Sequence, residues 1–169
     1  MRILATIFLC AVLAAGILAQ EKSEMKMDHG TAPKSAAGAK YWNANQAKWT
    51  DSKDIPGLHE AVISGDPAKG ASVIYLKFDP GTKVGWHWHT GPEIIYGDTG
   101  DLAVGMMKSS DTSHVTGGSY ARMPGHMIHK AECVSKDACG VYIESPQIFD
   151  YHPVDENGKE IKPAMPAAK

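Results

Sequence analysis

Residues 81–100, GTKVGWHWHTGPEIIYGDTG, contain two histidines separated by one residue in a run typical of a β-strand. Side chains two positions apart on a strand point to the same face, so His87 and His89 can present both imidazoles to one point. Glycine and proline in residues 90–92 predict a turn, which would bring Glu93 back beside the histidines on a neighbouring strand. Two imidazole nitrogens and a carboxylate oxygen suit a divalent first-row transition metal.

The histidine pair alone is weak evidence, because most histidines are surface residues or hydrogen-bonded core residues. The wider spacing is more specific. Gly81, five residues, His87, one residue, His89, three residues, Glu93, six residues and Gly100 together resemble the first signature motif of the cupin superfamily, with every fixed position filled. The resemblance implies that His87, His89 and Glu93 bind one metal ion.

A later segment resembles the second cupin motif, with Gly118, Pro124 and His129 in the expected positions. The resemblance implies that His129 is the fourth metal ligand. Two positions differ from the motif, since His126 stands where glycine is usual and Cys133 where asparagine is usual. The turn before His129 is therefore expected to differ in shape from the usual one.

Short strand-like runs separated by Gly- and Pro-rich turns continue along the chain, and no long helical pattern follows residue 41. This pattern predicts an all-β sandwich or barrel, and the cupin resemblance implies a double-stranded β-helix, or jelly roll, over residues 58–152. Residues 108–116 are predicted to form a polar loop, and 127–133 and 140–144 a hairpin. Predicted strands are residues 58–63, 71–78, 84–89, 93–96, 101–107, 119–123, 127–133, 140–144 and 148–151.

The two ends of the chain differ from this central part. Residues 1–19 have a positive start, an uncharged apolar run and a small-residue end, which predict a signal peptide and a secreted or periplasmic protein. An uncleaved anchor is the alternative, but the apolar run of about 16 residues is shorter than the roughly 20 of a spanning helix. Residues 20–40 are predicted to be a flexible leader, 41–57 an N-terminal arm and 153–169 a frayed C-terminal tail.

Charge and cysteine content restrict the partners and the environment. The net charge of −2 and the lack of any Lys/Arg run argue against nucleic-acid binding, and no further segment is apolar enough to span a membrane. In an exported protein, Cys133 and Cys139 could close a disulfide across a hairpin, worth roughly 2 kcal/mol. The alternative is that Cys133 is a free thiol near the metal.

Two classes of function fit these observations. The first is a metal-dependent enzyme, a dioxygenase or oxidase or, less expected, an isomerase or lyase, acting on a small molecule with bound iron, manganese, nickel, copper or zinc. His126 and Tyr96 are the candidate catalytic residues, and Tyr75 is a candidate pocket residue, although each also fits an ordinary surface or packing role. The second class is a non-catalytic module that binds or senses a metal or small ligand. Single-domain cupins are often dimers, so the resemblance implies a possible homodimer.

Overall fold

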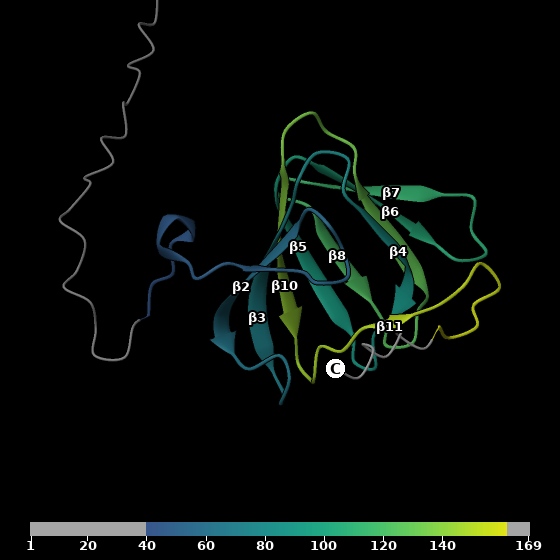
Figure 1. The fold of residues 1–169 in the computed structure, drawn as a ribbon, viewed down its shortest axis with the longest axis horizontal. Helices are drawn as coiled ribbons and strands as arrows, with labels where there is room; N and C mark the ends of the chain where they lie inside the picture. The colour runs from purple at the N-terminus through teal and green to yellow at the C-terminus, as the bar shows by residue number, and fades with distance from the viewer. Residues whose placement is uncertain (1–39, 162–169) are drawn as a thin grey trace, which may run out of the picture. The chain divides into compact units, whose positions relative to one another are not determined.

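The computed structural model describes residues 40–161, which form two antiparallel sheets that face each other (Figure 1). The first sheet has the strand order β1-β2-β3-β10-β5-β8 and the second has the order β11-β4-β9-β6-β7. The predicted all-β jelly-roll architecture is confirmed. In chain order the elements are the 3-10 turn η1 (Ala44–Gln46) and the strands β1 (Thr50–Asp51), β2 (Leu58–Gly65), β3 (Ser72–Phe78), β4 (Lys83–Trp88), β5 (Glu93–Thr99), β6 (Asp101–Met106), β7 (Thr112–Thr116), β8 (Tyr120–Met123), β9 (His129–Cys133), β10 (Cys139–Ser145) and β11 (His152–Pro153).

The hydrophobic core lies between the two sheets, because alternate side chains of each strand point inward. Both sheets contribute to one cluster of buried apolar side chains. On β3, the predicted inward set is confirmed for Ile74 and Phe78, which are 1% and 3% exposed. The opposite strands supply the matching layer, including Leu102 and Val104 of β6, which are also buried.

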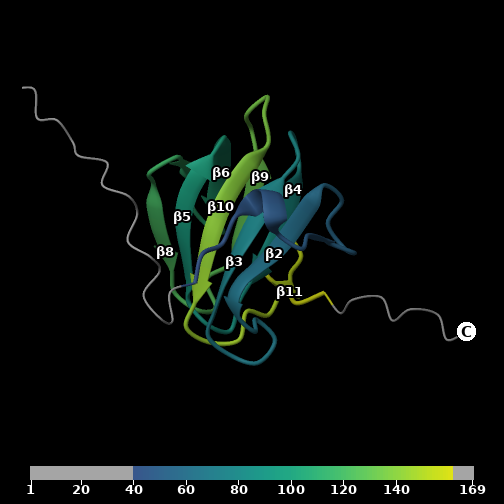
Figure 2. The same ribbon diagram turned by 90° about the vertical axis from the view of Figure 1, so that its left-hand side faces the viewer.

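The N-terminal arm lies across the outer face of the first sheet (Figure 2). Trp42 and Trp49 place their rings 5.5 Å and 5.8 Å from the ring of Tyr75, measured between centroids. Tyr142 packs edge-on against Tyr75 at 4.7 Å, and the Tyr75 hydroxyl donates a hydrogen bond to Asp98. Tyr75 is therefore part of an outer aromatic cluster, and the prediction that it lines an inner pocket is wrong.

The strand predictions miss the two-residue strands β1 and β11, and they are wrong at two further places in the described part of the chain. Residues 112–116 form β7, an edge strand of the second sheet, although 108–116 was predicted to be a loop. Val115 is the only buried residue of β7, so the sequence there shows no apolar alternation. Residues 148–151 form no strand, and the short strand β11 follows them. Their backbone is held by other contacts, such as the hydrogen bond that Phe149 N donates to the Pro67 carbonyl.

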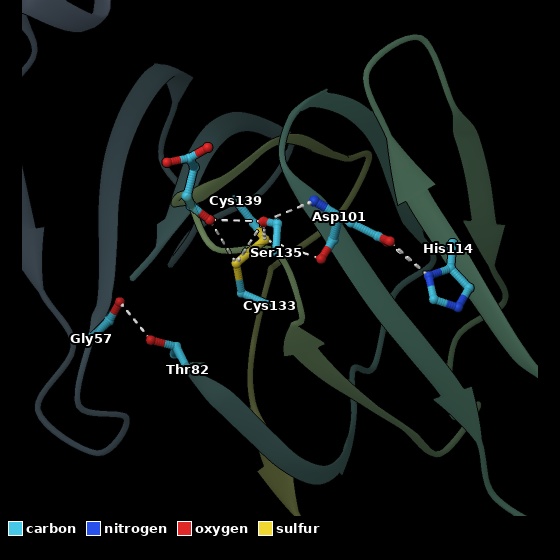
Figure 3. Close-up of a disulfide and its surroundings, with 8 residues drawn as sticks. Gly57, Thr82, Asp101, His114, Cys133, Ser135 and Cys139 are labelled. Carbon is cyan, nitrogen blue, oxygen red and sulfur yellow. Dashed lines mark hydrogen bonds and ion pairs between the residues drawn. A yellow bond between two sulfur atoms is a disulfide. The ribbon is translucent and has the colours of Figure 1, made fainter. Parts of the chain in front are cut away.

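Strands β9 and β10 do not form the predicted hairpin, because they belong to different sheets. Strand β9 pairs with β4 and β6, whereas β10 pairs with β3 and β5. The last residue of β9, Cys133, and the first residue of β10, Cys139, nevertheless form a disulfide (Figure 3). The predicted disulfide is confirmed, and it links the two sheets rather than two paired strands.

The connection between these strands is also held by hydrogen bonds to Ser135 (Figure 3). The Ser135 hydroxyl donates to the carbonyl of Asp137, and it accepts a hydrogen bond from the backbone N–H of Asp101. Both cysteines are at most 1% exposed. A short, closed connection therefore joins the sheets at this end of the fold.

The packed structure extends beyond residue 152. Pro153 pairs with His87 in β11–β4, Val154 is 4% exposed, and an isolated bridge joins Val154 to Glu160. Residues 1–39 and 162–169 lie outside the described residues, as do the predicted signal peptide, nearly all of the leader and the last part of the tail. Within residues 40–161, no helix has the length and hydropathy that a membrane-spanning helix needs.

Candidate metal centre

Three buried histidines meet at one end of the second sheet. His87 lies on β4 opposite His129 on β9, and His89 follows directly after β4. One ring nitrogen of each lies within 4.8 Å of the corresponding nitrogen of the other two. The three residues are 3–5% exposed, so the cluster is shielded from solvent. This arrangement follows from the predicted strand geometry, since His87 and His89 point to the same side.

Glu93 reaches this cluster from the opposite sheet. It is the first residue of β5, and the chain crosses from β4 to β5 through residues 90–92. Its Oε2 lies 3.2 Å from His129 Nε2 and 3.7 Å from His89 Nε2. Glu93 lies beside the histidines, as predicted, but the prediction that its strand neighbours theirs is wrong, because β4 and β5 belong to different sheets. The turn joins the two sheets, and the four side chains close the space between them.

Backbone carbonyls fix the orientation of all three imidazoles. The Nδ1–H of His87 donates to the Gly85 carbonyl at 2.8 Å, and that of His129 donates to the Met127 carbonyl at 2.9 Å. His89 Nδ1 donates in the same way to the Asp150 carbonyl. A proton on Nδ1 leaves the Nε2 lone pair available, which is the usual arrangement of metal-binding histidines.

The electrostatic setting keeps the first two histidines neutral. Burial, together with the nearby rings of His129 and His89, lowers the pKa of His87 to about 2. Burial also lowers the pKa of His89. Burial acts in the same direction on His129, but the nearby carboxylate of Glu93 outweighs it and raises the pKa of His129. A positive charge is therefore favoured between His129 and Glu93, either as a proton or as a cation.

The donor set fits a divalent transition metal. His89 Nε2 and Glu93 Oε2 are buried atoms without a hydrogen-bond partner among the described residues. Leaving such acceptors unsatisfied costs about 1–3 kcal/mol each. Three Nε2 lone pairs and one carboxylate oxygen converge without an intervening donor, which a single cation would satisfy. The four side chains predicted from the sequence are thus brought together.

A second layer of contacts positions His89. The carboxylate of Asp150 accepts hydrogen bonds from the backbone N–H of Thr90, at 2.7 Å, and from the Thr90 hydroxyl. It also lies 3.0 Å from His152 Nε2, and His152 stacks on Trp88 with 3.8 Å between ring centroids. These contacts hold the Asp150 backbone, whose carbonyl in turn orients His89.

Replacing Asp150 with alanine is expected to weaken metal binding by about 10- to 100-fold, the usual effect of losing an outer contact to a ligand. The backbone carbonyl remains, but the side chain that fixes its position is lost. Competition with a chromogenic chelator measures the dissociation constant. Asp150→Asn, which can still accept from Thr90, should recover part of the affinity. Asp111→Ala, in the exposed loop before β7, is the control, and equal affinities in all proteins would contradict this role.

A cavity of about 440 Å³ lies between the sheets, and its wall includes all four residues of the metal centre. Most of the remaining wall is apolar and comes from both sheets. Residues 50–54 of the N-terminal arm also line the cavity. These polar residues are mostly exposed, so they mark the mouth of the cavity. Apolar wall residues include Leu58, Leu76, Phe78, Val104, Val141 and Ile143.

The structure places His126 outside this cavity. It is exposed, and its ring lies 4.6 Å from Trp88, measured between centroids. Its φ of +62° is the left-handed conformation that glycine favours, which is consistent with glycine being usual at this motif position. Its N–H donates to the His89 carbonyl at 2.8 Å, and a Cβ on Gly125 would lie 2.4 Å from the Thr90 carbonyl oxygen. His126 therefore belongs to a packed turn, and its predicted catalytic role is not supported.

The second predicted catalytic residue, Tyr96, also lies outside the cavity. It is on the outer face of β5, is 41% exposed, and donates a hydrogen bond to Glu144 at 3.1 Å. The predicted strand 93–96 already implied this, because Tyr96 and Glu93 are an odd number of residues apart and face opposite ways. The cavity wall instead includes Glu60 and Tyr151, which belong to neither sequence motif. For Glu60 a partial signal is present, since it lies two residues after Leu58 on a predicted strand and therefore shares its face.

Comparisons with known proteins agree with this fold. A family model described as the ChrR cupin-like domain matches residues 37–148. A putative acetylacetone dioxygenase from Methylibium petroleiphilum superposes with a TM-score of 0.58 at 19% identity, covering 76% of this chain and 90% of the other. The polyketide cyclase RemF from Streptomyces resistomycificus gives 0.61 at 15% identity, covering 69% and 86%.

KdgF from a Halomonas species gives a TM-score of 0.53 at 21% identity, covering 64% of this chain and 94% of the other. A search of curated proteins finds no match. At these identities, the solved structures establish the fold alone. The family model covers well over half of the chain, and both sequence motifs meet at one buried site. The chain belongs to the cupin superfamily, in the family of ChrR cupin-like domains.

Proposed function

We propose that this protein is an exported, metal-dependent enzyme of the dioxygenase or oxidase type that acts on a small, largely apolar molecule. The observation that carries the proposal is the cavity of about 440 Å³ that reaches the buried His87, His89, Glu93 and His129. Substrate pockets typically have volumes of about 300–1,000 Å³ and mostly apolar walls. A site that only held a metal for stability would not need this space.

The four side chains would hold iron, manganese, nickel, copper or zinc. When bound, such an ion supplies Lewis acidity or redox chemistry at the inner end of the cavity. The apolar wall excludes water and strengthens electrostatic interactions inside. The carbonyls of Gly85, Met127 and Asp150 keep the imidazole orientations fixed, so the protein can bind and release small molecules without rebuilding the centre.

The lining also favours a class of substrate. Among the described residues that line the cavity, Lys53 is the only Lys or Arg, and it is exposed at the mouth. A molecule with several carboxylates would find no inner Lys or Arg to pair with. A neutral aromatic or diketone-like molecule with an ionisable hydroxyl or enol fits better. Solved proteins of this fold include ones described as a putative acetylacetone dioxygenase and a polyketide cyclase, which gives this class some support.

Export is part of the proposal. Residues 1–19 have the composition of a signal peptide, and disulfides persist mainly in oxidising compartments. The buried Cys133–Cys139 disulfide supports this location.

The competing function is a non-catalytic module that binds a metal or a small ligand. The four protein ligands favour this alternative, because they would complete a tetrahedral zinc site.

Elemental analysis of the purified protein, followed by reconstitution with each candidate metal, separates these functions. We expect near-stoichiometric iron, manganese, nickel or copper, and dioxygen consumption with neutral phenols, catechols or β-diketones but not with dicarboxylates. The variant His129→Ala should abolish that consumption. Zinc in the purified protein, with no turnover of any of these compounds by any metal form, would favour the non-catalytic module.

A further inference from the structure

Glu60 is a carboxylate of the cavity wall that is not part of the metal centre. Glu60 lies on β2, in register with Leu76 of β3 and Thr50 of β1. Leu58, two residues before it, also lines the cavity, whereas Ala61 pairs with Tyr75 and faces the outer aromatic cluster. The strand alternation therefore directs the Glu60 side chain inward, and it lines the same cavity as His87, His89, Glu93 and His129.

The surroundings of Glu60 are unusual for a carboxylate. The residue is half-buried in a wall that includes Leu58, Leu76 and Ile143. Burial raises the pKa of Glu60, and no hydrogen bond or charged group in residues 40–161 offsets this effect. Two other acids of the cavity wall differ, because Asp51 is paired with His59, and Asp150 with Thr90 and His152. A half-buried carboxylate without a partner costs stability, so a role in binding a ligand is its most direct explanation.

We propose that Glu60 is the proton acceptor of the cavity for a neutral hydroxyl or enol substrate. This inference rests on the proposed function and identifies the group that performs its proton transfer. In the step, the substrate O–H bond breaks, the proton moves to a carboxylate oxygen of Glu60, and the electron pair stays on the substrate oxygen. Glu60 becomes a neutral acid, and it can return the proton to the product.

The cavity requires a separate proton acceptor because the metal-centre residues already use their ring nitrogens and carboxylate for the backbone and for the metal. The Nδ1 protons of His87, His89 and His129 are donated to backbone carbonyls. Tyr96 and His126 lie outside the cavity. The titratable or charged groups that face the cavity beside Glu60 are Asp51, Lys53 and Asp54 at the mouth, the four metal-centre residues on β4, β5 and β9, and Asp150 and Tyr151 after β10. His59 is a neighbour on β2 but pairs with Asp51 and Asp79.

A chromogenic catechol tests the assignment directly. The full chain, loaded with redox-inert zinc, is titrated with 4-nitrocatechol, whose absorbance reports its ionisation, across the pH at which the free probe ionises. In wild-type protein we expect the probe to bind in ionised form even below that pH, because Glu60 takes its proton. Glu60→Gln should bind about 10- to 100-fold more weakly on the acid side, the usual scale for losing a hydrogen bond to a charged group. On the alkaline side, where the probe is already ionised, the two proteins should converge.

Two further variants make the result specific. Glu60→Leu matches the apolar wall and should fold at least as well, and it should show the same loss on the acid side. Glu144→Gln changes an exposed carboxylate on the outer face of the same sheet and should bind like the wild type. Zinc content is measured in every sample, and it should not change. A difference that is equal at all pH values would indicate a purely structural effect and overturn the assignment.

The failures of the two proposals are distinguishable. If wild-type protein binds the probe and both Glu60 variants bind it with the same affinity and pH profile, the Glu60 assignment is wrong and the proposed function stands. If zinc-loaded wild-type protein binds no catechol at all, the substrate class is wrong, and the role of Glu60 falls with it.

Discussion

Alanine in place of any one of His87, His89, Glu93 or His129 is expected to remove most of the bound metal. The three histidines offer one ligand atom each and are held in place through backbone carbonyls, and Glu93 Oε2 lies beside the ring nitrogens of His89 and His129. Loss of a group that only orients a ligand lowers metal affinity by about 10- to 100-fold. Loss of the ligand itself should exceed that range. Elemental analysis after dialysis against a weak chelator measures the metal retained per chain.

The control for these variants is His114→Ala. His114 is exposed on β7 and pairs with Asp101, so its removal should leave the metal content unchanged. Circular dichroism of each variant shows whether the sheets are retained. Unchanged metal stoichiometry in all four ligand variants would contradict the assigned centre. If only the three histidine variants lost the metal, Glu93 would not be a ligand, and the ligand set would be His87, His89 and His129.

The part of this centre that depends on local geometry was predictable from the sequence. His87 and His89 share a face because they are two residues apart on a strand, and this needs no knowledge of the fold. His129 was found only through its resemblance to a motif, since 39 residues separate it from His89 along the chain. The sequence predicts that Glu93 lies near the histidines, but it does not predict which sheet carries Glu93. A short turn does not reveal whether the following strand pairs with the preceding strand or crosses to the opposite sheet.

Other errors have the same origin in long-range contacts. Strand β7 was missed because Val115 is its only inward apolar residue, and pairing with β6 supplies what the local pattern lacks. His126 is a candidate base from its place three residues before His129, at a position where the motif usually has glycine, yet its ring lies against Trp88 and it does not line the cavity. Glu60 is difficult to identify from the sequence, because strand alternation places it on the face of Leu58 but does not show that this face lines a cavity until the opposite wall is known.

Removing the disulfide with the double variant Cys133→Ser/Cys139→Ser is expected to lower the free energy of unfolding by about 2 kcal/mol. The bond closes a short loop, with a sequence separation of 6, and the chain-entropy relation for so short a loop gives about this value. It also joins β9 to β10 across the two sheets, so its loss frees a connection that no strand pairing replaces. Chemical denaturation of the variant, and of the wild type under reducing conditions, measures the change.

The metal affinity of this double variant should stay close to that of the wild type. Cys133 and His129 stand at opposite ends of β9, and pairing with β4 and β6 holds the strand between them. A loss of stability without a loss of affinity would show that the bond serves the framework alone. A large loss of affinity would instead show that the sheet separation set by the disulfide controls how closely Glu93, on the first sheet, approaches the three histidines on the second. Equal stability of the oxidised and reduced proteins would contradict the stabilising role.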